Sequence, residues 1–343
     1  MVLINDNFEI IALIFLPLSS ILVYFLVRLW INYAIDNSLL DKPNIRSSHK
    51  MKTPIGGGLG VFITFTLILV FFFFNGYISL DYFLAFLSGS ILVSVIGFLD
   101  DLYDLASSLR LITHFLACML SLYFIGGLSS IEIYGTYIEL GLFGNLLGLF
   151  FLVWMINLYN FMDGINGIAG IEAVTVNFGA ALLFFLIDSA FLNWYLPLFL
   201  GFSCLGFLFW NFPNAKIFLG DIGSGFLGFI VGLFAIVSSL ENFDNFYAWI
   251  ILLAVFISDA TFTLIYRIYN REKFYLPHNN HVYQLLANKY SSHKIVSISI
   301  MFINILWLLP IAFLVINHIV EGIIGVMVAY FPFLFLSIYY RLK

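Results

Sequence analysis

Long apolar runs separated by short polar segments follow one another along the whole chain. A membrane-spanning helix needs about 20 mostly apolar residues. Runs of roughly this length, bounded by Gly, Asn, Pro or charged residues, predict helices at residues 8–30, 58–74, 82–99, 109–125, 142–159, 168–187, 194–211, 225–240, 248–269, 295–317 and 322–340. The pattern therefore predicts an all-α polytopic membrane protein with about 11 transmembrane helices.

Two segments need separate interpretation. Residues 129–140 alternate apolar and polar side chains about Gly135, which predicts a small external β-hairpin, with an irregular loop as the alternative. The first apolar run follows Asp6 rather than a basic segment and is too long for a signal-peptide core. We therefore expect it to be a retained first helix.

Composition supports the membrane interpretation. Of the 343 residues, 62% are hydrophobic and only 10% are Asp, Glu, Lys or Arg, whereas a soluble domain carries about 25% charged residues. The mean hydropathy is +1.05. A water-soluble globule is excluded, and we expect a single integral membrane domain over residues 1–343. Cys118 and Cys204 lie in apolar runs and indicate neither a disulfide nor a zinc site.

The basic residues predict the orientation. With the N-terminus outside, all 14 Lys and Arg residues fall on one side of the membrane. The positive-inside rule makes that side cytoplasmic, which also places the C-terminus in the cytoplasm. Polar residues gather in five loops on this side, which we expect to form the active site: residues 31–57, 100–110, 157–168, 212–224 and 270–294.

The first loop is basic and ends in glycines. Arg46, Lys50 and Lys52 precede a Gly-rich entry into the second helix, where cations and free backbone amides suit a phosphate. A polybasic topology signal is the alternative.

Adjacent carboxylates, Asp100 and Asp101, are expected at the end of the third helix. Neighbouring residues on a helix point about 100° apart, so one could face a site while the other supports it. The alternative is that they only stop the span. Acidic groups at the end of an apolar run are costly, which favours a function.

The third loop begins with Asn157, Asn160 and Asp163, whose spacing of three residues would align them on one helical face. Such a face supplies oxygen and amide groups to a hydrated metal, a diphosphate or a nucleoside. A polar seam between packed helices is the alternative, although it would be expensive in lipid.

The last two loops also carry metal-binding or phosphate-binding residue types. Asp221 lies between glycines just before the predicted eighth helix, where it could ligate Mg²⁺ or simply cap the helix. His278 and His281 could donate to phosphate oxygens or only solvate the surface. A short interfacial helix is expected at 282–287.

Asp259 and Glu172 are candidates for supporting roles or for helix pairing.

These groups suggest phosphoryl transfer to or from a lipid. Metal and cation positioning supply most of the catalysis in such reactions. The sequence has no G-x-x-x-x-G-K-[ST] loop, which argues against an ATP-driven pump.

Five motifs in order resemble the polyprenyl-phosphate N-acetylhexosamine-1-phosphate transferases of glycosyltransferase family 4. They are K-x-x-T-P-x-x-G-G at 50–58, D-D at 100–101, N-x-x-N-x-x-D-G-x-x-G at 157–167, L-G-D-x-G-S at 219–224 and H-x-x-H-x-Y-Q at 278–284. The resemblance implies transfer of a sugar 1-phosphate from a UDP-sugar to polyprenyl (undecaprenyl) phosphate, with release of UMP. It also implies a multi-pass enzyme of the bacterial inner membrane with a cytoplasmic active site.

The resemblance also implies roles for individual residues. Asp221 would bind Mg²⁺, for which Mn²⁺ could substitute, and Asp163 would belong to both the metal and the catalytic sets. Asp100 would act as base or position the lipid phosphate, beside Asp101. The remaining assignments are His281 as a catalytic contact to phosphate or nucleotide, and Lys50, Arg46, Asn157, Asn160, Asn166 and His278 as substrate-binding residues.

The sequence departs from the family's motifs at two places. Asn166 stands where many members have Asp, and His278-Asn-Asn-His281 replaces a run of three histidines. The second departure favours initiation of O-antigen, capsule or another surface polysaccharide over the muramoyl-pentapeptide transferase of peptidoglycan synthesis, which remains the alternative. Rival classes are a lipid or solute transporter and a non-catalytic scaffold. Polar clusters confined to one face disfavour the transporter. No nucleic-acid partner is expected, and a homodimer remains open.

Overall fold

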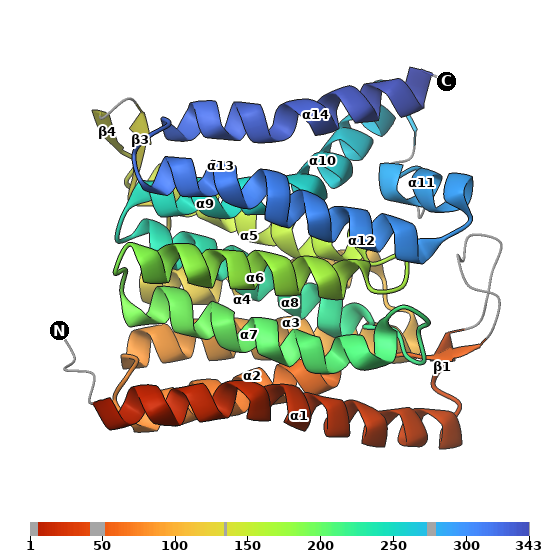
Figure 1. Cartoon of the computed structure of the whole chain (residues 1–343). Helices are drawn as coiled ribbons and strands as arrows, with labels where there is room; N and C mark the ends of the chain where they lie inside the picture. The colour runs from red at the N-terminus through yellow and green to blue at the C-terminus, as the bar shows by residue number, and fades with distance from the viewer. Residues whose placement is uncertain (1–5, 42–51, 134–135, 273–278, 343) are drawn as a thin grey trace.

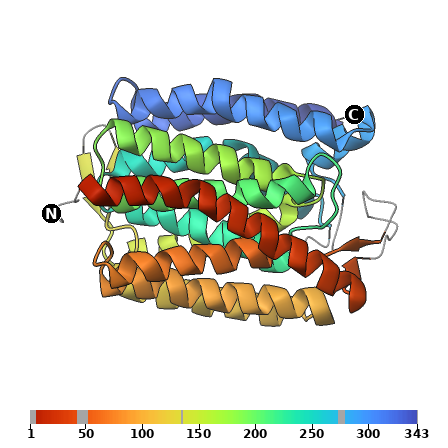
Figure 2. The same ribbon diagram turned by 60° about the horizontal axis from the view of Figure 1, so that its bottom comes forward.

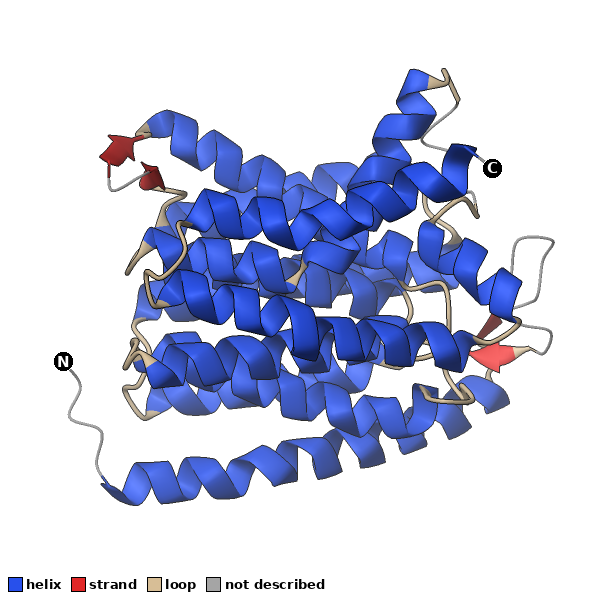
Figure 3. Ribbon diagram, turned by 45° about the horizontal axis from the view of Figure 1, so that its top comes forward, coloured by secondary structure: helices blue, strands red, loops and turns tan. Residues whose placement is uncertain are grey.

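The computed structural model of the chain describes residues 6–41, 52–133, 136–272 and 279–342, and helices make up most of them. Figure 3 shows that the few strands lie at two opposite ends of a helical bundle. The helices are α1 (Asp6–Asp36), α2 (Gly58–Phe74), α3 (Leu80–Tyr103), α4 (Ser107–Ile125), α5 (Leu142–Met162), α6 (Ile168–Leu186), α7 (Phe191–Asn211), α8 (Asp221–Ser239), α9 (Phe243–Leu252), α10 (Ala254–Tyr269), α11 (Val282–Tyr290), α12 (His293–Ile303), a π-helical turn η1 (Asn304–Leu308), α13 (Leu309–Ile316) and α14 (Gly322–Leu342).

Within these described residues, nine helices are long and apolar enough to cross a membrane. The bent pair α9 and α10 would make a tenth span, and α2 is a shorter apolar helix. Each of the eleven predicted apolar segments lies on one or more of these helices. The chain is therefore an all-α polytopic membrane protein, as predicted.

The two ends of the bundle carry different structures (Figure 1). At one end, β3 (Ser130–Ile133) pairs antiparallel with β4 (Thr136–Glu139), which confirms the predicted hairpin rather than the irregular loop. At the other end, where α11 also lies, β1 (Leu40–Asp41) pairs with β2 (Thr53–Pro54). Below, these are called the hairpin end and the α11 end. Figure 2 shows α1 running along the bundle between them, and α1 packs mainly on α7.

Helix α8 forms the centre of the bundle. Every residue from Ile222 to Ser239 is buried, and α8 packs against α2, α3, α5 and α9. Glycines permit very close approach at its first turn: a Cβ on Gly58 of α2 would lie 2.1 Å from the Cα of Gly223, and one on Gly97 of α3 would lie 2.5 Å from the carbonyl oxygen of Asp221. Small residues of this kind let membrane helices pack backbone to backbone. The start of α8 is thus held between α2 and α3.

Several predicted helix boundaries were wrong. Helix α8 begins at Asp221 rather than at residue 225, and α3 continues to Tyr103 rather than ending at residue 99. Both differences have a tertiary cause, because the end of α3 supplies acceptors to the first amides of α8. The predicted ninth helix is two helices that meet at Leu253 with a bend of 73°. No Pro or Gly lies at this break, so the usual sequence signals for a kink are missing.

The close crossing of α3 and α8 gives a first prediction. Gly97→Ala should destabilise the protein by about 1–3 kcal/mol, because the added methyl group meets backbone atoms that cannot rotate away. Thermal unfolding of the detergent-solubilised protein measures the effect. Gly148→Ala on α5 is the matched control, because its nearest neighbour would be the end of the Ile236 side chain at 3.4 Å. Equal stability of the two variants would contradict the close-packing account.

Candidate active site

The first turn of α8 is capped by a carboxylate from another helix. Asp101, near the end of α3, accepts hydrogen bonds from the backbone N–H of Asp221 through Oδ1 at 2.9 Å and of Ile222 through Oδ2 at 3.2 Å. Helix N-termini leave such N–H groups without intrahelical partners, and their partial positive charge favours an anion. Asp101 therefore holds the backbone of the residue that the motifs assign to the metal.

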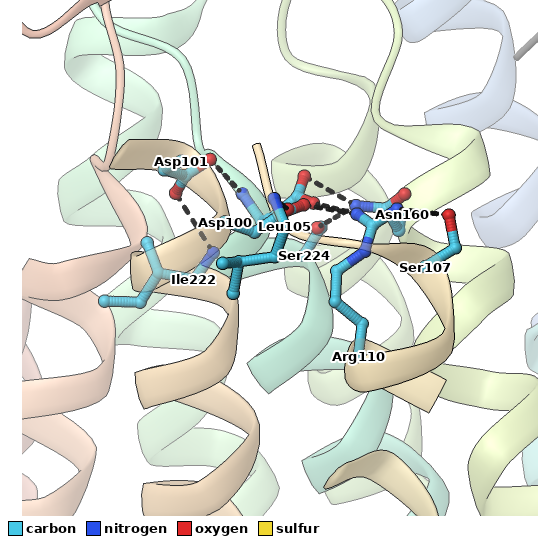
Figure 4. A network of polar contacts seen from close by, with 9 residues as sticks. Asp100, Asp101, Leu105, Ser107, Arg110, Asn160, Ile222 and Ser224 are labelled. Carbon is cyan, nitrogen blue, oxygen red and sulfur yellow. Dashed lines mark hydrogen bonds and ion pairs between the residues drawn. The ribbon is translucent and has the colours of Figure 1, made fainter. Parts of the chain in front are cut away.

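The side chain of Asp221 is held by two donors from other helices. Asn160, in the last turn of α5, donates from Nδ2 to Oδ1 at 2.7 Å and to the hydroxyl of Ser224 at 3.2 Å. Arg110 of α4 donates from Nη1 to Oδ2 of Asp221 at 2.9 Å. Figure 4 shows these side chains converging from α3, α4, α5 and α8.

Arg110 also joins Asp221 to Asp100. Its Nη1 atom forms an ion pair with Oδ2 of Asp100, while Oδ1 of Asp100 accepts the backbone N–H of Leu105 at 2.7 Å. Asp100 thus orders the turn between α3 and α4 and holds the guanidinium in place. Arg110 is not among the predicted site residues, where it counts only as one of the cytoplasmic basic residues. Its position in the first turn of an apolar helix, ten residues after Asp100, is the signal that could have marked it.

A polar cavity of about 270 Å³ opens beside this network at the α11 end. It is lined by the end of α5, the start of α8 and α11, including Asn160, Asp163, Asn166, Asp221 and Gln284. Asp163 is the first residue after α5. Burial raises the pKa of its carboxyl well above the usual range, and the nearby negative charge of Asp101 raises it further. A bound cation would relieve both effects.

The predicted polar face of α5 is confirmed only in part. Asn160 and Asp163 line the same cavity, whereas the amide of Asn157 donates to the carbonyl oxygen of Val153 within its own helix at 2.6 Å. Asn157 is not among the residues that line the cavity. Asn166 borders it, and its amide donates to the carbonyl oxygen of Pro213 at 3.1 Å.

Two residues of α12 that were not predicted hold the backbone of Asn166. The backbone N–H of Asn166 donates to Nδ1 of His293 at 3.3 Å, and the hydroxyl of Ser297 donates to the carbonyl oxygen of Asn166 at 2.9 Å. These contacts lie more than 125 residues apart in the chain, so no local sequence pattern could have indicated them. They fix the loop between α5 and α6.

His281 is buried and lies beside the cavity rather than on its lining. The short helix expected after it is confirmed as α11, which extends to Tyr290. The predicted residues Arg46, Lys50 and His278 lie outside the residues that the structure describes, so their roles stay predictions.

The cavity has the donor set of a magnesium site. Asp163, Asp221 and the amide oxygen of Asn160 are hard oxygen donors, and Mg²⁺ is commonly held by one or two carboxylates together with water and substrate phosphates. No group of three His, Cys, Asp or Glu side chains in the described part of the chain is arranged to hold a metal.

Comparison with known proteins identifies the family. Residues 83–239, which include Asp100, Arg110, Asn160 and Asp221, match the family described as Glycosyl transferase family 4. The chain is 30% identical over 267 residues to a Bacillus subtilis (strain 168) protein named "Probable undecaprenyl-phosphate N-acetylglucosaminyl 1-phosphate transferase", covering 76% of this chain and 73% of the relative. The chain belongs to glycosyl transferase family 4. This confirms the family expected from the motifs, and the protein is a membrane-embedded transferase.

Other members of the family show the range of activities among the relatives. A Thermotoga maritima "Undecaprenyl-phosphate alpha-N-acetylglucosaminyl 1-phosphate transferase" is 27% identical, covering 83% of this chain and 86% of its own. A Petrotoga mobilis "Phospho-N-acetylmuramoyl-pentapeptide-transferase" is 31% identical, covering 73% and 81%. The comparisons therefore reach both branches that the sequence analysis considered.

The bridging position of Arg110 gives the second prediction. Arg110→Gln should lower stability by about 1.5–3 kcal/mol, the usual contribution of a hydrogen bond to a charged group, and should reduce transferase activity, because Asp100 and Asp221 lose their shared cation. Thermal unfolding and a sugar-phosphate transfer assay measure the two effects. Arg110→Lys should retain part of both.

Lys216→Gln is the matched control for loss of a positive charge. Lys216 is an exposed residue at the α11 end whose ammonium lies 5.1 Å from the ring centroid of Trp210, so its loss should cost at most about 1 kcal/mol. A stable and fully active Arg110→Gln variant would remove Arg110 from the site.

Proposed function

We propose that this transferase moves an N-acetylhexosamine 1-phosphate from a UDP-sugar to polyprenyl (undecaprenyl) phosphate and releases UMP. The observation that carries the proposal is the convergence of Asp100, Asp163 and Asp221 with Arg110 beside a polar cavity at one end of an apolar bundle. A lipid phosphate can reach such a site from the bilayer, and a nucleotide can reach it from water. The names of the Bacillus subtilis and Thermotoga maritima relatives support the same reaction.

The reaction exchanges one phosphoanhydride bond for another. An oxygen of the lipid phosphate attacks the phosphorus that carries the sugar, and the bond from that phosphorus to the oxygen of UMP breaks. The sugar keeps its bond to its own phosphate. A phosphate monoester has a second pKa of about 6 and is therefore largely ionised at neutral pH. We accordingly favour direct attack, without a covalent aspartyl intermediate.

Direct attack assigns Asp100 a role other than that of a base. Its two oxygens accept hydrogen bonds from Leu105 and Arg110, so the side chain is placed to position the guanidinium. Arg110 in turn provides a planar, permanently charged donor of the kind that suits phosphate oxygens. We assign Arg110 to the phosphate groups that react, and Asp101 to the support of Asp221.

Asp163 and Asp221 would hold Mg²⁺, with Asn160 orienting the carboxylate of Asp221. When bound, the cation would neutralise charge on the diphosphate and on the leaving UMP. Asn166 and Gln284 offer amide groups at the cavity wall for the nucleotide or sugar. The predicted contacts of Lys50, Arg46 and His278 to phosphate or nucleotide complete the proposed site, whereas His281 is buried beside the cavity and would support its wall.

We place this reaction at the cytoplasmic face of the bacterial inner membrane, because the basic residues of the sequence lie on the side that carries the site motifs. The replacement of a histidine run by His278-Asn-Asn-His281 favours a step that initiates a surface polysaccharide. The similarity to muramoyl-pentapeptide transferases keeps that donor as the second candidate.

The deciding experiment is a donor panel. Purified protein with Mg²⁺ and undecaprenyl phosphate should release UMP with at least one UDP-N-acetylhexosamine, and more slowly or not at all with UDP-N-acetylmuramoyl-pentapeptide. Asp221→Ala should reduce the rate by about 100-fold or more, because it removes the ligand and the partner of Arg110.

Asp81→Asn is the control for this variant, because it removes an exposed carboxylate from the other end of α3. Its rate should equal that of the unmodified protein. Absence of UMP with every donor, or full activity in Asp221→Ala, would refute the proposed function. Faster UMP release with UDP-N-acetylmuramoyl-pentapeptide would instead assign the enzyme to peptidoglycan synthesis.

Metal removal tests the cofactor separately. Treatment with EDTA should abolish UMP release, and added Mg²⁺ or Mn²⁺ should restore it, because both cations accept carboxylate and phosphate oxygens. Asp163→Asn should raise the Mg²⁺ concentration needed for half-maximal rate. Undiminished turnover in EDTA would eliminate the metal from the mechanism.

A further inference from the structure

A buried carboxylate of α10 lies next to the active site without lining the cavity. Asp259 is 7% exposed, and it accepts hydrogen bonds from the backbone N–H of Val282 at 2.9 Å and of Tyr283 at 2.9 Å. The same carboxylate accepts the hydroxyl of Thr263 at 3.1 Å and lies 3.4 Å from Nδ1 of His281. Asp259 therefore caps the start of α11 from a different helix, as Asp101 caps α8.

The residues that Asp259 holds connect directly to the α5 end of the site. The hydroxyl of Tyr283 donates to the carbonyl oxygen of Phe161 at 2.9 Å, two residues before Asp163. A Cβ on Gly164 would lie 2.1 Å from that hydroxyl oxygen, so Gly164 is the residue that allows Tyr283 to reach the loop. The next residue, Gln284, lines the cavity.

The imidazole of His281 is fixed by its surroundings. It is 3% exposed and stacks with the rings of Phe161 and Tyr283, at centroid distances of 6.2 and 5.7 Å. Its backbone N–H donates to Oε1 of Gln284 at 3.3 Å. A carboxylate beside Nδ1 favours the proton on that nitrogen and orients the ring, as in other Asp–His pairs.

We propose that Asp259 is a positioning residue for the transfer reaction. It joins the second half of the broken span, α10, to the start of α11, and through His281, Tyr283 and Gln284 it sets the cavity wall that faces Asp163. The carboxylate accepts three hydrogen bonds, two of them from helix N-terminal amides, and Nδ1 of His281 lies 3.4 Å away, so the contact holds the start of α11 firmly against α10. The inference rests on the proposed function, because it explains how His281 and Gln284 would support the transfer reaction.

The first test measures hydrogen exchange of the detergent-solubilised protein at the contact between Asp259 and the start of α11. Asp259→Asn should accelerate exchange of the amides of Val282 and Tyr283, because an amide cannot accept from both as a carboxylate does. Exchange within α8 should stay as slow as in the unmodified protein. Thr263→Val is the matched control, because it removes the hydroxyl contact to the same carboxylate and leaves the two backbone contacts of that carboxylate to α11 in place. If exchange at Val282 and Tyr283 is unchanged, Asp259 does not hold the start of α11 and the proposal is wrong, whether or not UMP is released.

The second test is a double-mutant cycle on the rate of UMP release. Asp259→Asn and His281→Asn should each reduce kcat/KM for the UDP-sugar by about 100-fold, the cost of a misplacement of about 1 Å. The double variant should lose less than about threefold beyond the more impaired single variant, because the two residues act through one contact. The KM for the UDP-sugar should rise while the KM for the lipid phosphate stays unchanged, whereas a smaller folded fraction would lower the apparent kcat and change neither KM. If the losses in kcat/KM of the two single variants multiply in the double variant, Asp259 and His281 act independently and the proposal is wrong.

Tyr283→Phe decides the matter if Asp259→Asn does not fold. It removes only the hydroxyl that donates to Phe161, so the fold is retained, and the rate should fall by about tenfold, the usual effect of one lost neutral hydrogen bond. A Tyr283→Phe rate equal to that of the unmodified protein would refute transmission through this contact. An unmodified protein that releases no UMP would instead refute the proposed function.

Discussion

The buried start of α8 is the constraint on which the rest of the structure depends. An apolar environment offers no water to the free N–H groups of a helix N-terminus, and each unpaired group there costs several kcal/mol. Asp101 supplies the acceptors, and this requires the end of α3 to lie directly against α8. Gly97 makes that approach sterically feasible. The same turn carries Asp221, so the contact that allows α8 to begin inside the bundle also sets the position of the site carboxylate.

Within the described part of the chain, few cations contact the site carboxylates. Asp100 and Asp221 share the single guanidinium of Arg110, and Asp163 faces the cavity with a pKa raised by burial and by Asp101. Such a surplus of negative charge in a partly dehydrated place is unfavourable for folding alone. It suits a site where a divalent cation and a phosphate-bearing substrate enter together. The carboxylates that are electrostatically unfavourable for folding are therefore the same groups that can bind a cation together with a phosphate-bearing substrate.

Two carboxylates from neighbouring helices cap helices that carry site residues: Asp101 caps α8, and Asp259 caps α11. Hydrogen bonds of this type replace the local caps that helices in soluble proteins obtain from their own flanking residues. They also link elements that are distant in the chain, so the cavity wall is built from rigid helix ends. Preorganisation of this kind is what positional catalysis of phosphoryl transfer requires.

Prediction from the sequence succeeded where local pattern carries the information. Apolar run length indicated the helices, and period-two alternation indicated the hairpin. The motifs marked Asp100, Asn160, Asp163 and Asp221, which the structure brings to one end of the bundle, and their roles stay predictions. It failed where the decisive partner is distant. The partners of Arg110 lie on α3 and α8, and its only local signal is a charge in the first turn of an apolar helix. The 73° bend at Leu253 has no Pro or Gly to mark it. Asn157 is a different case, because its amide bonds within its own helix.

The sequence by itself determined that the chain is a bundle of apolar helices whose polar residues gather in a few loops, because burial in lipid leaves backbone hydrogen bonding few other solutions. It also determined the family, since five spaced motifs in order exceed what chance pattern provides. Only the tertiary structure decided which of the adjacent aspartates supports and which binds the arginine. It alone assigned Asp259 to the start of α11. Those outcomes depend on hydrogen bonds between different helices, spanning 10 to 120 positions of the chain, which no local periodicity encodes.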